Sequence, residues 1–312
     1  MDIDFDLIEF FHKDETLISM QKAGEGNMNL VIRVKTNQRS FILKQAKAYV
    51  VKYPSIPAPL DRIETEYRFY QSIEKILFLK EQSPKILDFV PEKQMILMED
   101  LGEVQDYTQL YQDPKIEGSI LIELLEYLNH LHQIIAEGFP QNLAMRKLNH
   151  EHIYQIPFEE GNGLNLDAIQ PGLQKLARPI QQNQLLKKAV LRLGERYLQT
   201  GSTLIHGDFY PGSWMMSQKG LMVIDPEFAF AGEPEFDLGV MAAHLKLAGV
   251  NIDLYKLIEA HYSNPYKMDA VRKWEGVEII RRLIGVAQLP LQKNIEEKES
   301  LLVYAAQQIL QP

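Results

Sequence analysis

Short strand-like runs separated by polar turns dominate the first hundred residues. In these runs apolar residues cluster or alternate with polar ones, and they lie at 16–21, 30–34, 41–43, 86–90 and 95–98. The polar turn Asn37-Gln38 joins the second run to the third, which predicts a β-hairpin. Between residues 60 and 79, apolar or aromatic side chains recur every three or four positions and predict one amphipathic helix.

The pattern changes near residue 100 and becomes mostly helical. Helical periodicity covers residues 116–136, 172–199, 236–248, 252–261 and 269–287. Prolines and glycines predict a loop or an interrupted insertion at 157–172, and residues 203–230 form a β-rich island between the helices. Strands and helices are therefore segregated along the chain. This predicts an α+β fold with a β-rich N-lobe at residues 1–100 and a mostly helical C-lobe at 101–312.

The composition is that of a globular protein and narrows the classes of partner. Of the 312 residues, 46% are hydrophobic and 24% are charged, and the net charge of -9 argues against a general nucleic-acid binder. There are no cysteines, so disulfides, thiolate zinc sites and thiol catalysis are excluded. The acidic start of the chain and the lack of an apolar run of about 20 residues argue against a signal peptide and a membrane span. We therefore expect a soluble, cytoplasmic protein that contacts neither nucleic acid nor membrane.

The β-rich island carries the candidate chemistry. Residues 204–208 are Leu-Ile-His-Gly-Asp, Ser213 follows five positions after Asp208, and a second apolar run ends at Asp225-Pro226-Glu227. A kinase catalytic loop followed by a metal-binding loop has this layout. There, the first Asp accepts the proton of the substrate hydroxyl, a polar residue five positions later faces a metal, and the second Asp holds Mg²⁺. Asp208 is therefore the candidate base, and Ser213 and Asp225 are candidate metal ligands.

Three upstream features occur in the order that a kinase requires. The turn Gly24-Glu25-Gly26-Asn27 could cover phosphates with backbone N–H groups, Lys44 at the end of a strand could bind them, and Glu64 on the next helix could pair with Lys44. Seen alone, each feature has a structural interpretation, because glycines favour turns, a strand lysine is usually solvated, and Glu64 could pair with Arg68 at i,i+4. Their ordered occurrence favours the kinase interpretation.

At these positions the sequence resembles a known family. Residues 204–208, followed by Pro211-Gly212, are similar to the aminoglycoside and choline phosphotransferase superfamily, and the chain is more closely similar to its methylthioribose kinase branch. The segments that carry the closer resemblance are GEGNMN at 24–29, KQA at 44–46, RIE at 62–64, MEDL at 98–101, VIDPEFAF at 223–230, FDLG at 236–239 and EIIRRLIG at 278–285. They extend from residue 24 to residue 285, so the resemblance covers nearly the whole chain.

The resemblance implies a two-lobed, protein-kinase-like fold that binds ATP between its lobes. The backbone near Glu99 and Leu101 would hold the adenine, and the glycine turn and Lys44 would lie near the phosphates. The residues assigned in this way to nucleotide binding are Gly24, Gly26, Asn27, Lys44, Glu64, Glu99 and Leu101.

The resemblance also implies that Asp208 is the catalytic base and that Asp225 and Glu227 bind Mg²⁺, which prefers such oxygen ligands. Ser213 stands where the superfamily usually has a metal-binding Asn. Because a Ser hydroxyl is a weaker metal ligand than an Asn carbonyl, we expect Glu227 to take over that coordination.

Two adjacent arginines are the candidates for contact with the acceptor substrate. On a helix, Arg281 falls on an otherwise apolar stripe, whereas Arg282 and Glu278 are i,i+4 neighbours. We therefore expect Arg281 to face the acceptor or a phosphate and Arg282 to pair with Glu278. Asp237 resembles the structural Asp that braces a catalytic loop, and His206 is expected to pack and hydrogen-bond rather than to act as a base.

The sequence thus predicts an ATP- and Mg²⁺-dependent kinase of a hydroxyl on a small metabolite, with a methylthioribose-like sugar as the leading acceptor. The helical lobe looks shorter than in the methylthioribose kinase branch, and Glu233 and Glu235 leave a cationic acceptor open, such as an aminoglycoside, choline or an amino sugar. A catalytically silent nucleotide-binding module is the remaining alternative, and the retained catalytic and metal-binding candidates weigh against it. The oligomeric state, a homodimer included, stays open.

Overall fold

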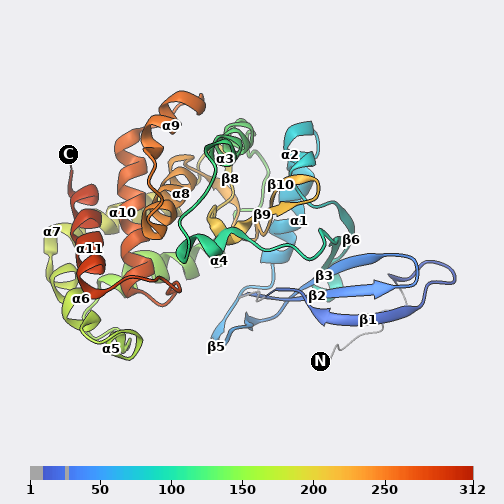
Figure 1. Ribbon diagram of the computed structural model, residues 1–312, viewed down its shortest axis with the longest axis horizontal. Helices are drawn as coiled ribbons and strands as arrows, with labels where there is room; N and C mark the ends of the chain where they lie inside the picture. Colours follow the sequence, from blue (N-terminus) through green and yellow to red (C-terminus); the bar gives the residue numbers. More distant parts are fainter. Residues whose placement is uncertain (1–9, 25–27, 312) are drawn as a thin grey trace.

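An antiparallel sheet of five strands forms the first part of the molecule in a computed structural model, which describes residues 10–24 and 28–311. The strand order is β1-β2-β3-β7-β6 (Figure 1). The strands are β1 Leu17–Lys22, β2 Asn29–Thr36, β3 Ser40–Ala46, β6 Ile86–Val90 and β7 Met95–Glu99. All five predicted strands are therefore present, each within a few residues of its expected bounds.

Alternation along β3 decides which of its side chains face the helices. Phe41 and Leu43 are buried on one face of the sheet. Ile42 and Lys44 point to the opposite face, against which helix α1 (Arg62–Ile73) packs. Lys44 lies within the strand rather than at its end, and it is held inside the lobe on the side that the helix covers.

The single helix predicted at 60–79 is two helices, α1 and α2 (Leu77–Glu81), separated by a turn at residues 74–76. Helical periodicity places Leu77 on the buried side, but its side chain is 68% exposed. The turn redirects the chain so that Leu79 enters the core, where it is fully buried. The sequence pattern also does not predict the small hairpin of β4 (Tyr49–Val50) and β5 (Tyr53–Pro57), because its prolines are unfavourable in most strands.

Helices make up most of the second part, at the opposite end of the molecule from the sheet (Figure 1). They are α3 Gly118–Leu131, α4 Leu143–His150, α5 Leu166–Ile169, α6 Leu173–Gln182, α7 Gln184–Leu198, α8 Glu235–Ala248, α9 Leu254–His261, α10 Met268–Ile284 and α11 Ile295–Leu310. Within the described ranges, none of the helices is long and apolar enough to cross a membrane. The predicted boundary at residue 100 falls directly after β7, and its status as a domain boundary stays a prediction.

Helix α10 packs against α8 on one side and against α11 on the other. A glycine allows the first of these contacts to be close. A Cβ atom on Gly239 of α8 would lie 2.7 Å from the Cβ of Trp274 and 2.9 Å from the carbonyl oxygen of Val271, both on α10. Polar side chains of the two helices can therefore meet directly.

The β-rich island consists of two short antiparallel strand pairs. Strand β8 (Thr203–Ile205) pairs with β11 (Phe230–Gly232), and β9 (Trp214–Ser217) pairs with β10 (Gly220–Val223). Two loops leave these strands, residues 206–213 after β8 and residues 224–229 after β10. These loops carry the predicted catalytic and metal-binding residues.

Two helix starts in the C-lobe show how side chains set the boundaries. The helix predicted at 172–199 is interrupted at Asn183, whose side chain accepts a hydrogen bond from the Leu186 N–H at 3.0 Å and so begins α7. The sequence pattern does not predict α11. Asn294 and Glu297 form a capping box at its start, and this spacing is a sequence signal that could have located the helix.

Candidate active site

A buried carboxylate from α8 holds the loop that carries Asp208. Asp237 accepts hydrogen bonds from the backbone N–H groups of His206 at 2.7 Å and Gly207 at 2.9 Å, and His132 Nε2 lies 3.1 Å from the same carboxylate. Gly207 has a φ of +82°, and a Cβ atom there would come within 2.2 Å of a backbone carbonyl oxygen, so the turn requires glycine. The bracing role predicted for Asp237 is confirmed.

His206 connects this loop to the loop that follows β10. Its Nε2 lies 3.1 Å from the carbonyl oxygen of Ile224, and the Asp208 N–H donates to its Nδ1 at 3.4 Å. Burial lowers the pKa of His206, so the ring is neutral, with Nε2–H donating and Nδ1 accepting. His206 therefore packs and hydrogen-bonds, as predicted.

Asp208 retains access to solvent, with 19% of its side chain exposed, and Arg282 Nη2 lies 3.4 Å from its Oδ1. Burial raises the pKa of Asp208 to about 6, and the positive charges of Arg282 and Arg281 limit the rise. A carboxylate that titrates near neutral pH is suited to general-base catalysis. The buried hydroxyl of Ser213 donates to the carbonyl oxygen of Asp208 at 2.8 Å, so Ser213 helps to fix the loop.

Lys44 joins the sheet to α1 and to the loop after β10. Its Nζ lies 2.6 Å from Glu66 Oε2 and forms a second ion pair with the carboxylate of Asp225. Burial alone would lower the pKa of Lys44, but Asp225 and Glu66 raise it, so the amine is cationic. Burial raises the pKa of Glu66 to about 7, although Lys44 opposes the rise.

The predicted partner of Lys44 is wrong. Glu64 is 52% exposed and lies 3.5 Å from Arg68, whereas Glu66 is buried and contacts Lys44. The reason is helical phase, because Glu66 follows Ile63 by three positions and so lies on the buried face of α1, while Glu64 points outward. The same periodicity that predicts the helix could have identified Glu66.

The loop after β10 presents two carboxylates. Asp225 has a φ of +67°, and 44% of its side chain is exposed. Glu227 is buried, and its Oε2 accepts a hydrogen bond from Asn29 Nδ2 at 2.9 Å and lies 3.1 Å from Arg62 Nε. Burial and the negative charge of Asp225 raise the pKa of Glu227. The sequence assigns no role to Asn29 or Arg62, although both lie in segments that carry the family resemblance.

This donor set fits Mg²⁺. The contacts around the loop join two cationic side chains to three carboxyl groups, so acidic groups outnumber cations beside the exposed oxygen atoms of Asp225. Its members are Lys44, Arg62, Glu66, Asp225 and Glu227. No group of three or more His, Cys, Asp or Glu side chains in the described residues could hold a metal ion unaided. Phosphate oxygens would therefore complete the coordination, as is usual for Mg²⁺.

The segment that links the sheet to the C-lobe is anchored on both sides. Asp100 lies 2.9 Å from Arg33 of β2, and the carboxylate of Glu99 forms an ion pair with Lys219 in the turn between β9 and β10. Leu101 is half-buried. These contacts hold the backbone at Glu99 and Leu101 in place, and the adenine contact assigned to that backbone stays a prediction.

The predicted phosphate-covering turn is described only in part. Gly24 follows β1 and has a φ of +71°, a conformation that glycine adopts readily. Gly26 and Asn27 lie outside the described residues.

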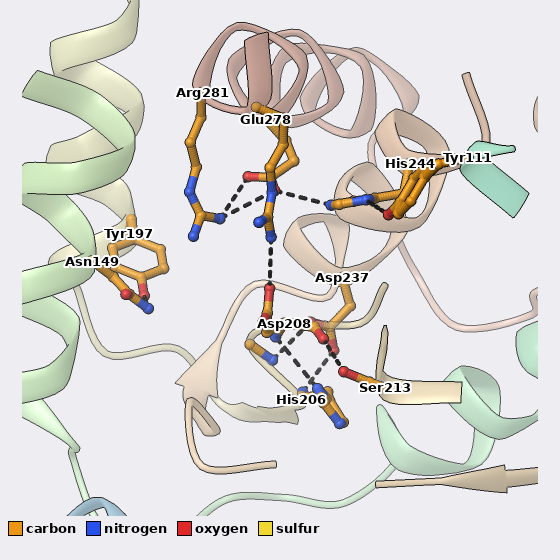
Figure 2. A network of polar contacts seen from close by, with 12 residues as sticks. Tyr111, Asn149, Tyr197, His206, Asp208, Ser213, Asp237, His244, Glu278 and Arg281 are labelled. Atoms are coloured by element: carbon orange, nitrogen blue, oxygen red, sulfur yellow. Dashed lines mark hydrogen bonds and ion pairs between the residues drawn. The ribbon is translucent and has the colours of Figure 1, made fainter. Parts of the chain in front are cut away.

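Glu278 of α10 is the centre of a buried polar network (Figure 2). Its carboxylate accepts hydrogen bonds from Arg281 Nη1 at 2.9 and 3.1 Å, from Arg282 Nε at 2.6 Å and from His244 Nε2 at 3.1 Å. Burial alone would raise the pKa of Glu278, but the two arginines lower it well below its usual range. Burial lowers the pKa of His244 to about 4, so its neutral ring donates to Glu278 and accepts from the Tyr111 hydroxyl.

The predicted pairing of Arg282 with Glu278 is confirmed, but the predicted separation of the two arginines is wrong. Both guanidinium groups pair with Glu278, and Arg282 rather than Arg281 reaches Asp208. Long helical side chains lean toward the helix N-terminus, so residues three and four positions after Glu278 can both contact it. Contact with an acceptor stays a prediction for both arginines.

Sequence comparison assigns the chain to a family. Residues 19–272 match the family described as "Phosphotransferase enzyme family". Because this match covers more than half of the chain, the protein belongs to that phosphotransferase family.

Individual relatives of the chain are named methylthioribose kinases. One from Exiguobacterium sibiricum is 31% identical over 256 residues, which cover 74% of this chain and 61% of that protein. One from Bacillus cereus is 25% identical over 342 residues, which cover 93% of this chain and 84% of that protein. The chain thus spans less than two thirds of the first relative and more than four fifths of the second.

Solved structures show the same fold. The choline kinase LicA from Streptococcus pneumoniae has a TM-score of 0.52 at 13% identity and covers 94% of this chain and 93% of its own. The ADP-bound aminoglycoside phosphotransferase APH(2'')-Ib has a TM-score of 0.53 at 15% identity. The match covers 99% of this chain and 100% of that protein's chain. At such low identity the likeness shows the fold alone, and the predicted α+β, kinase-like fold is confirmed.

Proposed function

We propose that this protein is an ATP- and Mg²⁺-dependent kinase that transfers a phosphoryl group to a hydroxyl of a small metabolite. The observation that carries the proposal is the convergence of two loops, with Asp208 on one and Asp225 and Glu227 on the other, beside Lys44. Family membership and relatives named as kinases support it. A location in the cytoplasm and assembly as a homodimer stay predictions.

The nucleotide would bind beside the sheet. Lys44 would exchange its contact with Asp225 for a phosphate oxygen while Glu66 keeps the amine in position. The adenine would meet the backbone of Glu99 and Leu101, and the turn that contains Gly24, Gly26 and Asn27 would cover the phosphates. Adenine nucleotides bound to fold neighbours, AMP in LicA among them, are consistent with this assignment.

Asp225 and Glu227 would hold the Mg²⁺. When bound, the ion supplies positive charge that neutralises the phosphate oxygens during transfer. Ser213 is a weaker candidate, because its hydroxyl already donates to the carbonyl oxygen of Asp208.

Asp208 would act as the base. Its carboxylate accepts the proton of the acceptor hydroxyl while that oxygen forms a bond to the γ-phosphorus, and the bond from the γ-phosphorus to the oxygen of ADP breaks. Arg282, whose Nη2 lies 3.4 Å from Asp208 Oδ1, would stabilise negative charge on the transferred group.

A neutral or anionic acceptor such as a methylthioribose-like sugar is favoured over a cationic one. The two carboxylates that left a cationic acceptor open are engaged, since Glu233 pairs with Arg196 and Glu235 accepts from the Lys267 N–H at 2.9 Å. In Figure 2, Arg281 extends from α10 toward the side of Tyr197, where an acceptor beside Asp208 could meet it. The names of the relatives support the same acceptor class.

An acceptor screen tests the proposal. ATP consumption is measured with methylthioribose, other sugars, choline and aminoglycosides, for the wild type and for Asp208→Asn as the control. We expect acceptor-dependent ADP release that requires Mg²⁺, is greatest with a methylthioribose-like sugar and is lost in the variant. Turnover with choline or an aminoglycoside would show that the acceptor is cationic rather than neutral or anionic. Nucleotide binding without turnover on any acceptor would favour a catalytically silent binding module.

A further inference from the structure

Arg62 is a fully buried arginine in the first turn of α1, and its contacts extend well beyond that helix. Its Nη2 donates to the carbonyl oxygens of Met28 at 3.1 Å and Lys47 at 3.0 Å, and its Nη1 donates to the carbonyl oxygen of Pro59. Its Nε donates to Asn29 Oδ1 at 3.0 Å. Three segments of the N-lobe, at residues 28–29, 47 and 59, therefore converge on one guanidinium group.

One contact of Arg62 leaves the N-lobe. Its Nε lies 3.1 Å from Glu227 Oε2, and Asn29 Nδ2 donates to the same oxygen at 2.9 Å. Arg62, Asn29 and Glu227 thus form a closed triangle. The amide of Asn29 has one orientation that satisfies both neighbours, because a guanidinium only donates and a carboxylate only accepts.

Both contacts fall on Oε2 of Glu227, which leaves Oε1 as the oxygen available to an ion. Carboxylates that bind metals are usually held by hydrogen bonds from neighbouring residues, and these neighbours tune metal affinity. Arg62 and Asn29 have the donors, the burial and the position that such a role requires.

We propose that Arg62 and Asn29 are positioning residues for the metal site, which fix Glu227 so that its second oxygen serves the Mg²⁺ bound with Asp225. This inference rests on the proposed function, because it assumes that the two carboxylates bind Mg²⁺. Arg62 and Asn29 belong to α1 and β2, whereas Glu227 belongs to the loop after β10. The placement of a metal ligand in one lobe thus depends on two residues of the other.

The test compares nucleotide binding with and without metal. ADP affinity is measured by calorimetry in Mg²⁺ and in chelator for the wild type, Arg62→Lys and Asn29→Ala, and Mn²⁺ affinity is measured by electron paramagnetic resonance. We expect each variant to lose about 10-fold or more in metal affinity, the size typical for residues that orient a metal ligand. ADP binding without metal should stay within about two-fold of the wild type. Arg68→Lys is the matched control, because it makes the same substitution on an exposed side chain of the same helix.

A double variant separates positioning from support of the fold. If Arg62 acts through Glu227, Arg62→Lys should add little further loss of metal affinity in a Glu227→Gln background. Equal losses of ADP affinity with and without metal, or a full additional loss in the Glu227→Gln background, would overturn the proposal.

Two further outcomes are also decisive. If Arg62→Lys does not fold, Asn29→Ala decides, because it removes a contact to Glu227 and leaves the three carbonyl contacts of Arg62 in place; unchanged metal affinity in this variant overturns the proposal. A wild type that binds no nucleotide with Mg²⁺ refutes the proposed function itself. That result differs from one in which the wild type binds nucleotide with Mg²⁺ and the variants have the same metal affinity as the wild type, which refutes only the positioning role of Arg62 and Asn29.

Discussion

The proposed nucleotide side and the proposed acceptor side of the site differ in their balance of acidic and basic groups. On the nucleotide side carboxylates outnumber cations, whereas on the acceptor side two carboxylates balance two guanidinium groups. The first group comprises Lys44, Arg62, Glu66, Asp225 and Glu227, and the second comprises Asp208, Glu278, Arg281 and Arg282. The proposed nucleotide side thus has more acidic groups than cations, which Mg²⁺ would offset, while on the proposed acceptor side the two kinds of group are equal in number and are held by their own hydrogen bonds.

This difference predicts different consequences of substitution. On the proposed nucleotide side, contacts such as that of Lys44 with Asp225 would be exchanged on ligand binding, so variants should alter metal and nucleotide binding. On the acceptor side, Glu278 already fixes both arginines, so variants should alter the rate and its pH dependence rather than nucleotide affinity.

The largest effect is expected at Asp208, where the two sides meet. Asp208→Asn should reduce kcat by about 10²–10⁴-fold, the typical worth of a positioned base, while ADP affinity in Mg²⁺ stays near the wild-type value. Steady-state kinetics and calorimetry on the same preparation measure both. A variant that keeps more than about a tenth of the wild-type rate would remove Asp208 from the role of base.

The next effect distinguishes two glutamates on α1. Glu66→Gln removes a buried ion-pair partner of Lys44 and should lower the free energy of unfolding by about 1.5–3 kcal/mol, the range for hydrogen bonds to charged groups. Glu64→Gln loses only an exposed pair with Arg68 and should cost at most about 0.5 kcal/mol. Chemical denaturation measures both, and equal losses would contradict the assignment of Glu66 as the partner of Lys44.

Variants of Arg281 and Arg282 should differ in the pH dependence of kcat/KM. Asp208 must be ionised to accept a proton, so kcat/KM should fall as the pH drops through about 6, where protonation of its carboxylate begins to dominate. Arg282 and Arg281 both lower the pKa of Asp208, with Arg282 the stronger of the two. Arg282→Gln should therefore move the acidic limb to higher pH, and Arg281→Gln should move it less. An unmoved limb in Arg282→Gln would mean that another group controls it.

The smallest effect is expected at Tyr111. Tyr111→Phe removes the hydroxyl that donates to His244 and should lower the free energy of unfolding by about 0.5–1.5 kcal/mol, the usual net worth of one hydrogen bond. Nucleotide affinity should not change, because the network lies on the acceptor side. Thermal denaturation and ADP titration check the two parts, and a loss of ADP affinity would show that the two sides are coupled.

The nucleotide side could be predicted from the sequence because each of its parts is local. A strand that carries Lys44, and an apolar run that ends at Asp225, are visible within a few residues of each motif. The wrong prediction on this side was that Glu64 pairs with Lys44. It followed the order of the kinase motifs, whereas the helical periodicity of α1 indicates Glu66. Local sequence patterns could not identify Asn29 and Arg62, because both contact Glu227, which is distant in the sequence. Asn29 and Glu227 are 198 residues apart.

The acceptor side could not be predicted in the same way. Tyr111 and His244 meet across 133 residues of sequence, and the close packing of α8 on α10 at Gly239 decides that His244 reaches Glu278. A helical-wheel argument also treats side chains as radial, whereas the flexible side chains of Arg281 and Arg282 converge on one carboxylate.

Product analysis tests the central claim most directly. The wild type is incubated with ATP, Mg²⁺ and methylthioribose, or with the acceptor that the screen selects, and the products are measured by ³¹P NMR. The claim that the two sides meet at Asp208 to transfer a phosphoryl group predicts equal amounts of ADP and a phosphate ester of the acceptor, with neither formed by Asp208→Asn. ADP that appears with inorganic phosphate and without a phosphorylated acceptor would contradict it.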